Sequence, residues 1–259
     1  MYKLYLTALL SVVLLAGACK EEILAPRDLS ADYAYYPLEI GTSNFYRMDS
    51  IVLFNTVQGV VYDTITAEVR ETLVESFVDA DGTIVFRGER WQRPDAASPW
   101  HFVQTYTAHR NERTAVRSED NLSFTKLVFP LRENVRWDGN AAFDDNRPFV
   151  IGGGFVTVYR GWSYRYLEVR EPVSLDTGIE LPEAVYVEQD TSANNFIERR
   201  LAYERYAPGI GRIERFIDAR DTQCVVCCNQ TNTDLCATLP WDEKAEEGFI
   251  LRELFVRRE

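Results

Sequence analysis

The sequence is poor in several residue types that particular classes of protein require. Only 14 of its 259 residues are Gly and 10 are Pro, whereas 13% are aromatic, which excludes a collagen-like repeat and a disordered chain. Lys and Arg together number 28 against 40 Asp and Glu, giving a formal net charge of −12. Nucleic acid is a polyanion bound through Lys and Arg, so nucleic acid is not an expected partner. The length fits one large domain or two small ones around a buried core.

Catalytic motifs are also lacking. The sequence contains no His-Glu-x-x-His, Walker loop or Gly-x-Ser-x-Gly. Its two histidines, His101 and His109, would lie about 26 Å apart on one strand, too far to share a metal. Residues 152–154 are three glycines, but a phosphate-binding glycine loop precedes a helix. A β-branched and aromatic run follows these glycines, so a turn into a strand is expected instead. We therefore predict no catalytic residue and no enzymatic activity.

The long hydrophobic run lies at the N-terminus. It follows a single cation, extends from Leu4 to Ala18 and is followed directly by Cys19. A bilayer-spanning helix needs about 20 apolar residues, so a shorter run that ends in small residues is typical of a cleaved secretory signal. The cysteine directly after those small residues makes the segment resemble a bacterial lipoprotein signal. That resemblance implies a signal peptide at 1–18 and acylation of Cys19. Two acyl chains on this cysteine would anchor the protein stably in a membrane. The alternative is an ordinary signal peptide with an incidental cysteine.

The segment 19–32 is predicted to be the acylated cysteine followed by a polar tether. Its Lys20-Glu21-Glu22 resembles the short export tag of surface lipoproteins in Bacteroidota. A solvated charged tether would give the same pattern. We expect lipid anchoring in the outer membrane. The protein would face either the cell surface or the periplasm.

From Tyr33 onward the dominant hydrophobic period is two. Between 63 and 70, for example, Ile65, Ala67 and Val69 alternate with polar residues, as in a half-buried strand. A second strand is predicted at 72–78, followed by a hairpin turn at Asp81-Gly82.

About eleven such strands, with few helical stretches, predict the fold class. We expect a mainly β protein: a single antiparallel meandering curved sheet, half-barrel or barrel-like, with few short helices. No Pro/Gly/Ser-rich internal linker is present, so 33–259 is predicted to be one β-rich domain with an irregular excursion at 130–161.

Three sequence blocks resemble uncharacterised outer-membrane lipoproteins of Bacteroidota. They are YYPLEIG at 35–41, KLVFP at 126–130 followed by WDGN at 137–140, and ERYAPGIG at 204–211. The resemblance implies a similar envelope lipoprotein with a curved sheet like that of lipoprotein carriers. It implies no activity, because fold alone does not specify function.

A Cys-rich loop is predicted at 221–240. Its cysteines are Cys224, Cys227, Cys228 and Cys236. Outside the cytoplasm an even number of cysteines favours disulfides, so we expect two bridges, Cys224 pairing with Cys227 or Cys228 and Cys236 with the other. A tetrahedral zinc site and a redox-active pair are the alternatives.

One further loop gathers oxygen donors suited to calcium: Asp138, Asn140, Asp144 and Asp145. The calcium-loop spacing Asp-x-Asp-x-Asp-Gly is absent, and Asp and Asn are common turn formers. No cofactor is therefore expected, with calcium here and zinc at the cysteines as the alternatives.

These observations favour a lipid-anchored envelope protein with a non-enzymatic binding or accessory role. Its expected partners are outer-membrane lipid, through Cys19, and an envelope protein, or a hydrophobic or glycan ligand. The alternative is an envelope hydrolase such as a glycosidase, which needs only two carboxylates and leaves no motif. An accessory subunit of a larger assembly would expose an apolar patch.

Overall fold

The structure is a computed structural model that describes residues 28–194, 196–223 and 237–259. Of the described residues, 61% lie in strands and 5% in helices, and the two short helices described are α2 (Ser30–Tyr33) and α5 (Trp241–Lys244). The mainly β fold class is thus confirmed. Among the described residues, no helix has the length and apolar character needed to cross a membrane.

One large antiparallel sheet of twelve strands makes up the body. Its hydrogen-bonded order is β6-β5-β4-β3-β2-β1-β14-β13-β12-β11-β10-β7, and β8 and β9 form a separate small hairpin. The strands are β1 (Ser43–Thr56), β2 (Gly59–Val78), β3 (Ile84–Arg93), β4 (His101–Arg110), β5 (Thr114–Glu119), β6 (Leu122–Val128), β7 (Arg136–Trp137), β8 (Phe149–Ile151), β9 (Gly154–Val156), β10 (Tyr164–Ser174), β11 (Glu180–Asn194), β12 (Glu198–Ala207), β13 (Gly211–Asp221) and β14 (Glu247–Arg258).

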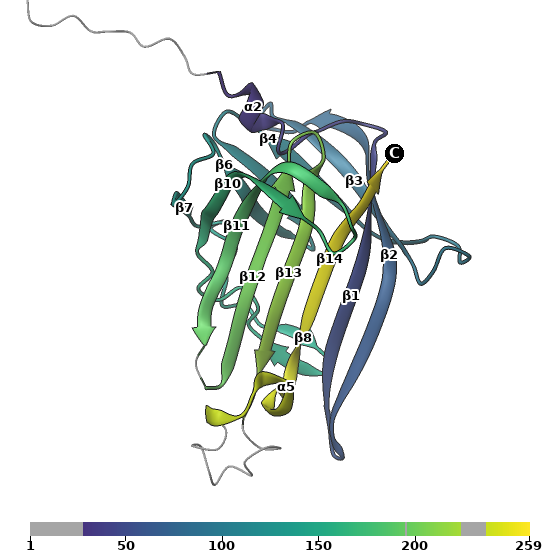
Figure 1. Cartoon of the computed structure of the whole chain (residues 1–259), viewed down its shortest axis with the longest axis vertical. Coiled ribbons are helices and arrows are strands. Elements are labelled where there is room, and N and C mark those ends of the chain that lie inside the picture. The colour runs from purple at the N-terminus through teal and green to yellow at the C-terminus, as the bar shows by residue number, and fades with distance from the viewer. Residues whose placement is uncertain (1–27, 195, 224–236) are drawn as a thin grey trace, which may run out of the picture.

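The sheet curves until its two edges nearly meet, as a barrel does (Figure 1). A few hydrogen bonds join β6 to the opposite edge. Thr125 N donates to Gly139 O at 2.8 Å, and Trp137 Nε1 donates to Thr125 O at 2.8 Å. The hydroxyl of Tyr166 on β10 lies 2.8 Å from the nitrogen and 2.7 Å from the oxygen of Val128. One backbone hydrogen bond and the side chains of Trp137 and Tyr166 therefore join the two edges, which strand pairing leaves apart.

The predicted break between two strands at residue 71 is wrong, because β2 runs unbroken through this position for 20 residues. Ala67 and Val69 are buried as the alternation predicts, whereas Ile65 is 42% exposed. Ile65 lies in the β1–β2 hairpin, which extends beyond the other strands at one end of the sheet (Figure 1). The next inward-facing residue of β2 after Val69 is Glu71, which is 6% exposed.

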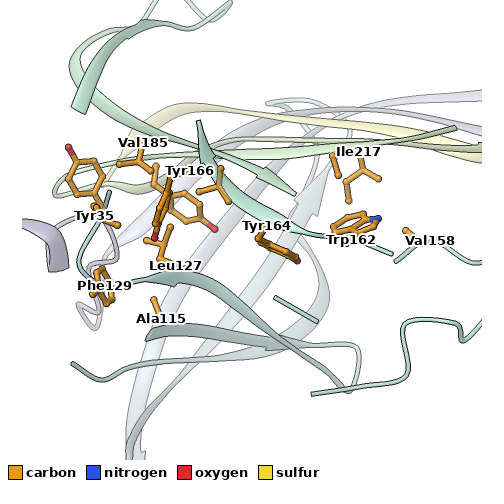
Figure 2. Close-up of a cluster of buried hydrophobic side chains, with 14 of the residues drawn as sticks. Tyr35, Ala115, Leu127, Phe129, Val158, Trp162, Tyr164, Tyr166, Val185 and Ile217 are labelled. Carbon is orange, nitrogen blue, oxygen red and sulfur yellow. The ribbon is translucent and has the colours of Figure 1, made fainter. Parts of the chain in front are cut away.

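Apolar packing is concentrated where the sheet closes. The cluster includes Leu127 of β6 together with Tyr164 and Tyr166 of β10, none of them exposed. Figure 2 shows Trp162 and Tyr164 next to each other in this cluster, with ring centroids 6.2 Å apart. Aromatic side chains thus fill the space that the incomplete backbone closure leaves.

The segment 29–42 covers one end of the sheet (Figure 1). Arg110 of β4 holds it there by donating from Nη1 to the carbonyl oxygens of Tyr33 and Tyr36, at 2.6 and 3.0 Å. Buried Asp32 of α2 accepts from Leu131 N at 3.1 Å and pairs with Arg170. The chain enters the folded body at this end, where the C-terminus also lies.

Candidate functional site: an interior ion network and its cavity

Charged side chains occupy inward-facing positions of the sheet, where apolar residues would be expected. None of them is more than 12% exposed, and they contact one another across the interior. We call this set the interior ion network: Glu71, Arg90, Arg117, Glu119, Lys126, Glu204, Arg212, Arg215 and Glu253.

Glu71 of β2 lies at the centre of one half of the network. It accepts from Arg90 Nη1 at 2.8 Å, from both terminal nitrogens of Arg117 at 2.9 and 3.0 Å, and from Arg212 Nη2 at 3.2 Å. Burial opposes ionisation of this carboxyl, but the three guanidinium groups outweigh it and hold the pKa of Glu71 below its ordinary value. Glu71 is therefore an anion at neutral pH.

Glu253 of β14 joins the same group of arginines. It pairs with Arg90, and its Oε2 lies 3.0 Å from Arg212 Nη2. Burial raises the pKa of Glu253, and the adjacent arginines lower it by more, so the net direction is downward. Arg90 and Arg212 thus each connect β2 with β14.

Glu204 of β12 lies at the centre of the other half. Its Oε1 is 3.0 Å from Lys126 Nζ, and its Oε2 accepts from Gln189 Nε2 at 2.8 Å and from the Tyr206 hydroxyl at 2.6 Å. Arg215 Nε lies 3.8 Å from Oε1. Despite full burial, these neighbours lower the pKa of Glu204 to about 2.

Glu119, at the end of β5, completes the set. It accepts from Arg117 Nε at 2.8 Å and lies 3.3 Å from Arg215 Nη1. Burial opposes its charge, and Arg117 and Arg215 hold its pKa well below the ordinary range. The network therefore holds four carboxylates and five cations, an excess of one positive charge.

A cavity of about 80 Å³ connects this network with the end of the sheet that α2 covers. Its wall extends from exposed Glu39 to fully buried Glu204. Charged wall residues are Glu39, Glu71, Arg117, Lys126, Glu204, Arg212 and Arg258. The wall also contains apolar residues near the mouth, among them Leu38 and Ile210. The arrangement suits a ligand whose polar group lies inside the cavity and whose less polar part lies at the mouth.

A second, wider hollow of about 520 Å³ lies beside the N-terminal half of β4. β5 pairs with β4 only from Thr107 to Arg110, so residues 101–106 have no partner strand on that side among the described residues. Phe102, Tyr106, Glu119 and Asp120 lie along this hollow. Burial and the charge of Glu119 raise the pKa of Asp120.

In the structure, the oxygens of the predicted calcium loop accept hydrogen bonds from other groups of the protein. Asp138 Oδ1 accepts from Asn140 N at 2.9 Å, and Asp144 Oδ1 from Asn146 N at 3.1 Å. Asp145 accepts from Gly161 N at 3.1 Å. Asn140 Oδ1 accepts from the Tyr164 hydroxyl at 3.0 Å.

The other predicted site residues fall partly outside what the structure describes. In the described part of the chain, no group of three or more His, Cys, Asp or Glu is arranged to hold a metal ion. The lipidation residue Cys19 and the cysteines at 224, 227, 228 and 236 lie outside the described residues. Acylation, disulfide pairing and zinc binding therefore stay predictions.

None of the interior ion network was among the predicted site residues. The signal was present in the alternation: Glu71 follows Ala67 and Val69 at every second position, and Glu204 stands between Ala202 and Tyr206. A charged residue in the apolar phase of a strand marks an interior charge. Its partners come from distant strands, so the sequence alone does not show which ones it meets.

Comparison with known proteins finds two solved structures that are similar to this chain. No protein-family model and no curated protein sequence matches the chain. A Bacteroides fragilis NCTC 9343 protein that is inferred to be exported, with a YmcC-like fold, is 12% identical; the match covers 86% of this chain and 98% of that chain, with a TM-score of 0.41. An inferred lipoprotein of Parabacteroides distasonis ATCC 8503 is 9% identical. That match covers 87% of this chain and 98% of that chain, with a TM-score of 0.39. Similarity at this level assigns neither family nor function, so the resemblance to envelope lipoproteins stays a prediction.

Proposed function

We propose that this chain is a lipid-anchored protein of the bacterial cell envelope with a non-enzymatic binding or accessory role. Acylated Cys19 would anchor it in the outer membrane, and the cavity above the interior ion network would receive its ligand. The observation that carries the proposal is the pairing of every carboxylate of the network with cations.

That pairing argues against acid catalysis in the interior. A glycosidase needs one carboxyl whose pKa is raised, so that it can donate a proton at neutral pH. The four network carboxyls all have lowered pKa values, including that of Glu204 at about 2. They supply fixed negative charge and hold the arginines in place, which serves binding.

The position of the cavity also fits an anchored protein. The eleven residues that follow Cys19, up to and including Ser30, can span at most about 40 Å. The anchor would therefore keep the end of the sheet that carries α2 and the cavity mouth close to the membrane surface (Figure 1).

An envelope protein partner is part of the proposal. The β1–β2 hairpin exposes apolar side chains, including Phe54, Val61 and Tyr62, at 38%, 53% and 43%. Exposed apolar groups of this kind are what a partner would cover. They lie toward the end opposite α2, so partner and membrane would contact different ends (Figure 1).

The first experiment tests the anchor. Cys19→Ala in the native host should abolish incorporation of labelled palmitate and move the protein out of the outer-membrane fraction. Lys20→Ala, the matched control, keeps the cysteine and should leave acylation intact, while protease access in whole cells reports on surface orientation. Palmitate incorporation by the Cys19→Ala protein would refute the proposed anchor.

The second experiment tests binding. The mature protein, extracted from its own membrane in mild detergent, should show an extra non-covalent mass in its native mass spectrum. A bare acylated monomer that also turns over glycosides would contradict the binding role.

One observation favours the hydrolase alternative and allows it to be tested. Glu119 and Asp120 are adjacent, line the second hollow and have pKa values shifted in opposite directions. If they act as base and acid, Asp120→Asn should abolish hydrolysis of glycoside substrates that the wild type cleaves. The binding proposal expects no such hydrolysis by either protein.

A further inference from the structure

The cavity wall carries more positive than negative charge. Its buried part contains Arg117, Lys126 and Arg212 against Glu71 and Glu204. At the mouth, Arg258 Nη2 donates to Glu39 Oε2 at 2.8 Å, so that pair is neutral. The rest of the network adds two cations and two carboxylates. The excess of one positive charge thus lies in the wall of the cavity.

Two guanidinium groups of the wall have donors that no atom of the described residues accepts. Arg212 is 8% exposed, and its Nε is buried without a hydrogen-bond partner. Arg258 Nη1 is likewise buried and unpartnered. Buried polar groups are nearly always hydrogen-bonded, so two such donors on residues that line one small cavity are what an acceptor from outside the described residues would satisfy.

The carboxylates of the wall are already occupied. Glu71 accepts from three arginines, and Glu204 from Lys126, Gln189 and Tyr206. A cationic ligand would therefore find its counter-ions taken and would meet an excess of positive charge. An anion would instead be attracted by this excess of positive charge, and guanidinium groups suit carboxylate and phosphate oxygens in particular.

We propose that this cavity binds a small anionic group, a carboxylate or a phosphate, through Arg212 and Arg258. This inference rests on the proposed binding function and names the ligand class. Asn44 also lines the cavity, and its Oδ1, which has no partner among the described residues, would accept from a hydroxyl of the ligand. The volume of about 80 Å³ holds about five to eight waters, which is room for such a group but not for a large ligand. The remainder of the ligand lies at the mouth, against Leu38 and Ile210.

The experiment uses the full mature lipoprotein in neutral detergent at constant ionic strength. Inorganic phosphate and acetate are titrated separately, and the thermal unfolding midpoint and the binding heat are recorded. At least one of the two should bind saturably and raise the midpoint. Loss of a charge-assisted hydrogen bond weakens binding by about tenfold or more, which is the effect expected for Arg258→Gln.

Arg257→Gln is the matched control. Arg257 is the neighbouring residue on β14, does not line the cavity and pairs with Glu259 at 2.6 Å, so its loss should leave anion affinity unchanged. Arg212→Lys keeps the charge but removes the orphaned Nε, and should also weaken binding. Circular dichroism identifies any variant that has not folded. Wild-type affinity in folded Arg258→Gln, or no saturable binding of either anion, would overturn the inference.

Two further arms separate the sources of the anion. Displacement of bound phosphate by vesicles containing phosphatidylglycerol, but not by pure phosphatidylcholine vesicles, would assign the group to a lipid headgroup. Displacement by neither would assign it to a free metabolite. A native mass spectrum with a neutral adduct, together with no anion binding, would overturn this inference while leaving the binding function standing.

Discussion

Lys126 on β6 and Glu204 on β12 form an ion pair, 3.0 Å long, across the interior of the curved sheet. The two strands are far apart in the hydrogen-bonded order of the sheet, and 78 residues separate the two side chains in sequence. Curvature of the sheet brings them together, and their pairing in turn links its opposite walls. The stability of the fold should therefore depend on ionisation in the interior.

The first prediction concerns acid. Glu204 has its pKa lowered from 4.5 to about 2, and the other network carboxyls are shifted the same way. A carboxyl with a lowered folded-state pKa stabilises the protein above the unfolded pKa, and this contribution is lost as pH falls through the folded value. The free energy of unfolding should therefore fall steadily from about pH 4.5 toward pH 2.

Urea titrations across this pH range provide the measurement. Glu204→Gln removes one of the linked groups, so its unfolding free energy should depend less steeply on pH. A variant with the wild-type slope would show that folding does not lower the pKa of Glu204.

The second prediction concerns the centre of the network. Glu71→Gln leaves Arg90, Arg117 and Arg212 without their shared carboxylate, and breaking a buried pair in this way costs about 3–5 kcal/mol. Glu75→Gln, on the same strand, is the control. Glu75 is 56% exposed and pairs with Arg87, so its loss should cost about 0–1 kcal/mol. Equal free energies of unfolding for the two variants would contradict the structural role of Glu71.

The third prediction concerns a close approach inside the sheet. Gly88 of β3 lies opposite Tyr106 of β4, and a Cβ at Gly88 would come within 2.1 Å of the Tyr106 ring. Gly88→Ala should cost about 1–3 kcal/mol through overpacking. In a double-mutant cycle with Tyr106→Leu, which withdraws the ring, the cost of the pair should be less than the sum of the two single costs. Strict additivity would show that the ring does not occupy this space.

The fourth prediction concerns the Cys-rich loop. If Cys224, Cys227, Cys228 and Cys236 form two disulfides, the intact mature protein should be lighter by four hydrogens before reduction than after it. Closing such short loops would stabilise the protein by about 2–3 kcal/mol in the chain-entropy model. A mass that reduction does not change, together with zinc released by acid, would support the metal alternative.

The fold was largely predictable because strand alternation is local. The Asp81-Gly82 turn, for example, is present, with Gly82 at φ 81° and its nitrogen donating to Asp79 O at 3.1 Å. The break predicted near residue 71 was wrong, because β2 continues unbroken through Glu71. In the structure it points inward, where arginines from other strands compensate for its charge.

The sequence by itself determined the mainly β class, because a period of two requires no knowledge of distant contacts. It also supplied the predictions of an N-terminal signal and of Cys19 as an anchor, since both are contiguous in the chain. The interior ion network and its cavity were decided by tertiary structure alone. Their residues come from β2, β3, β5, β6, β12, β13 and β14. Only the closing curvature of the sheet makes charges so distant in sequence into mutual partners, and only their summed charge gives the cavity its excess of one positive charge.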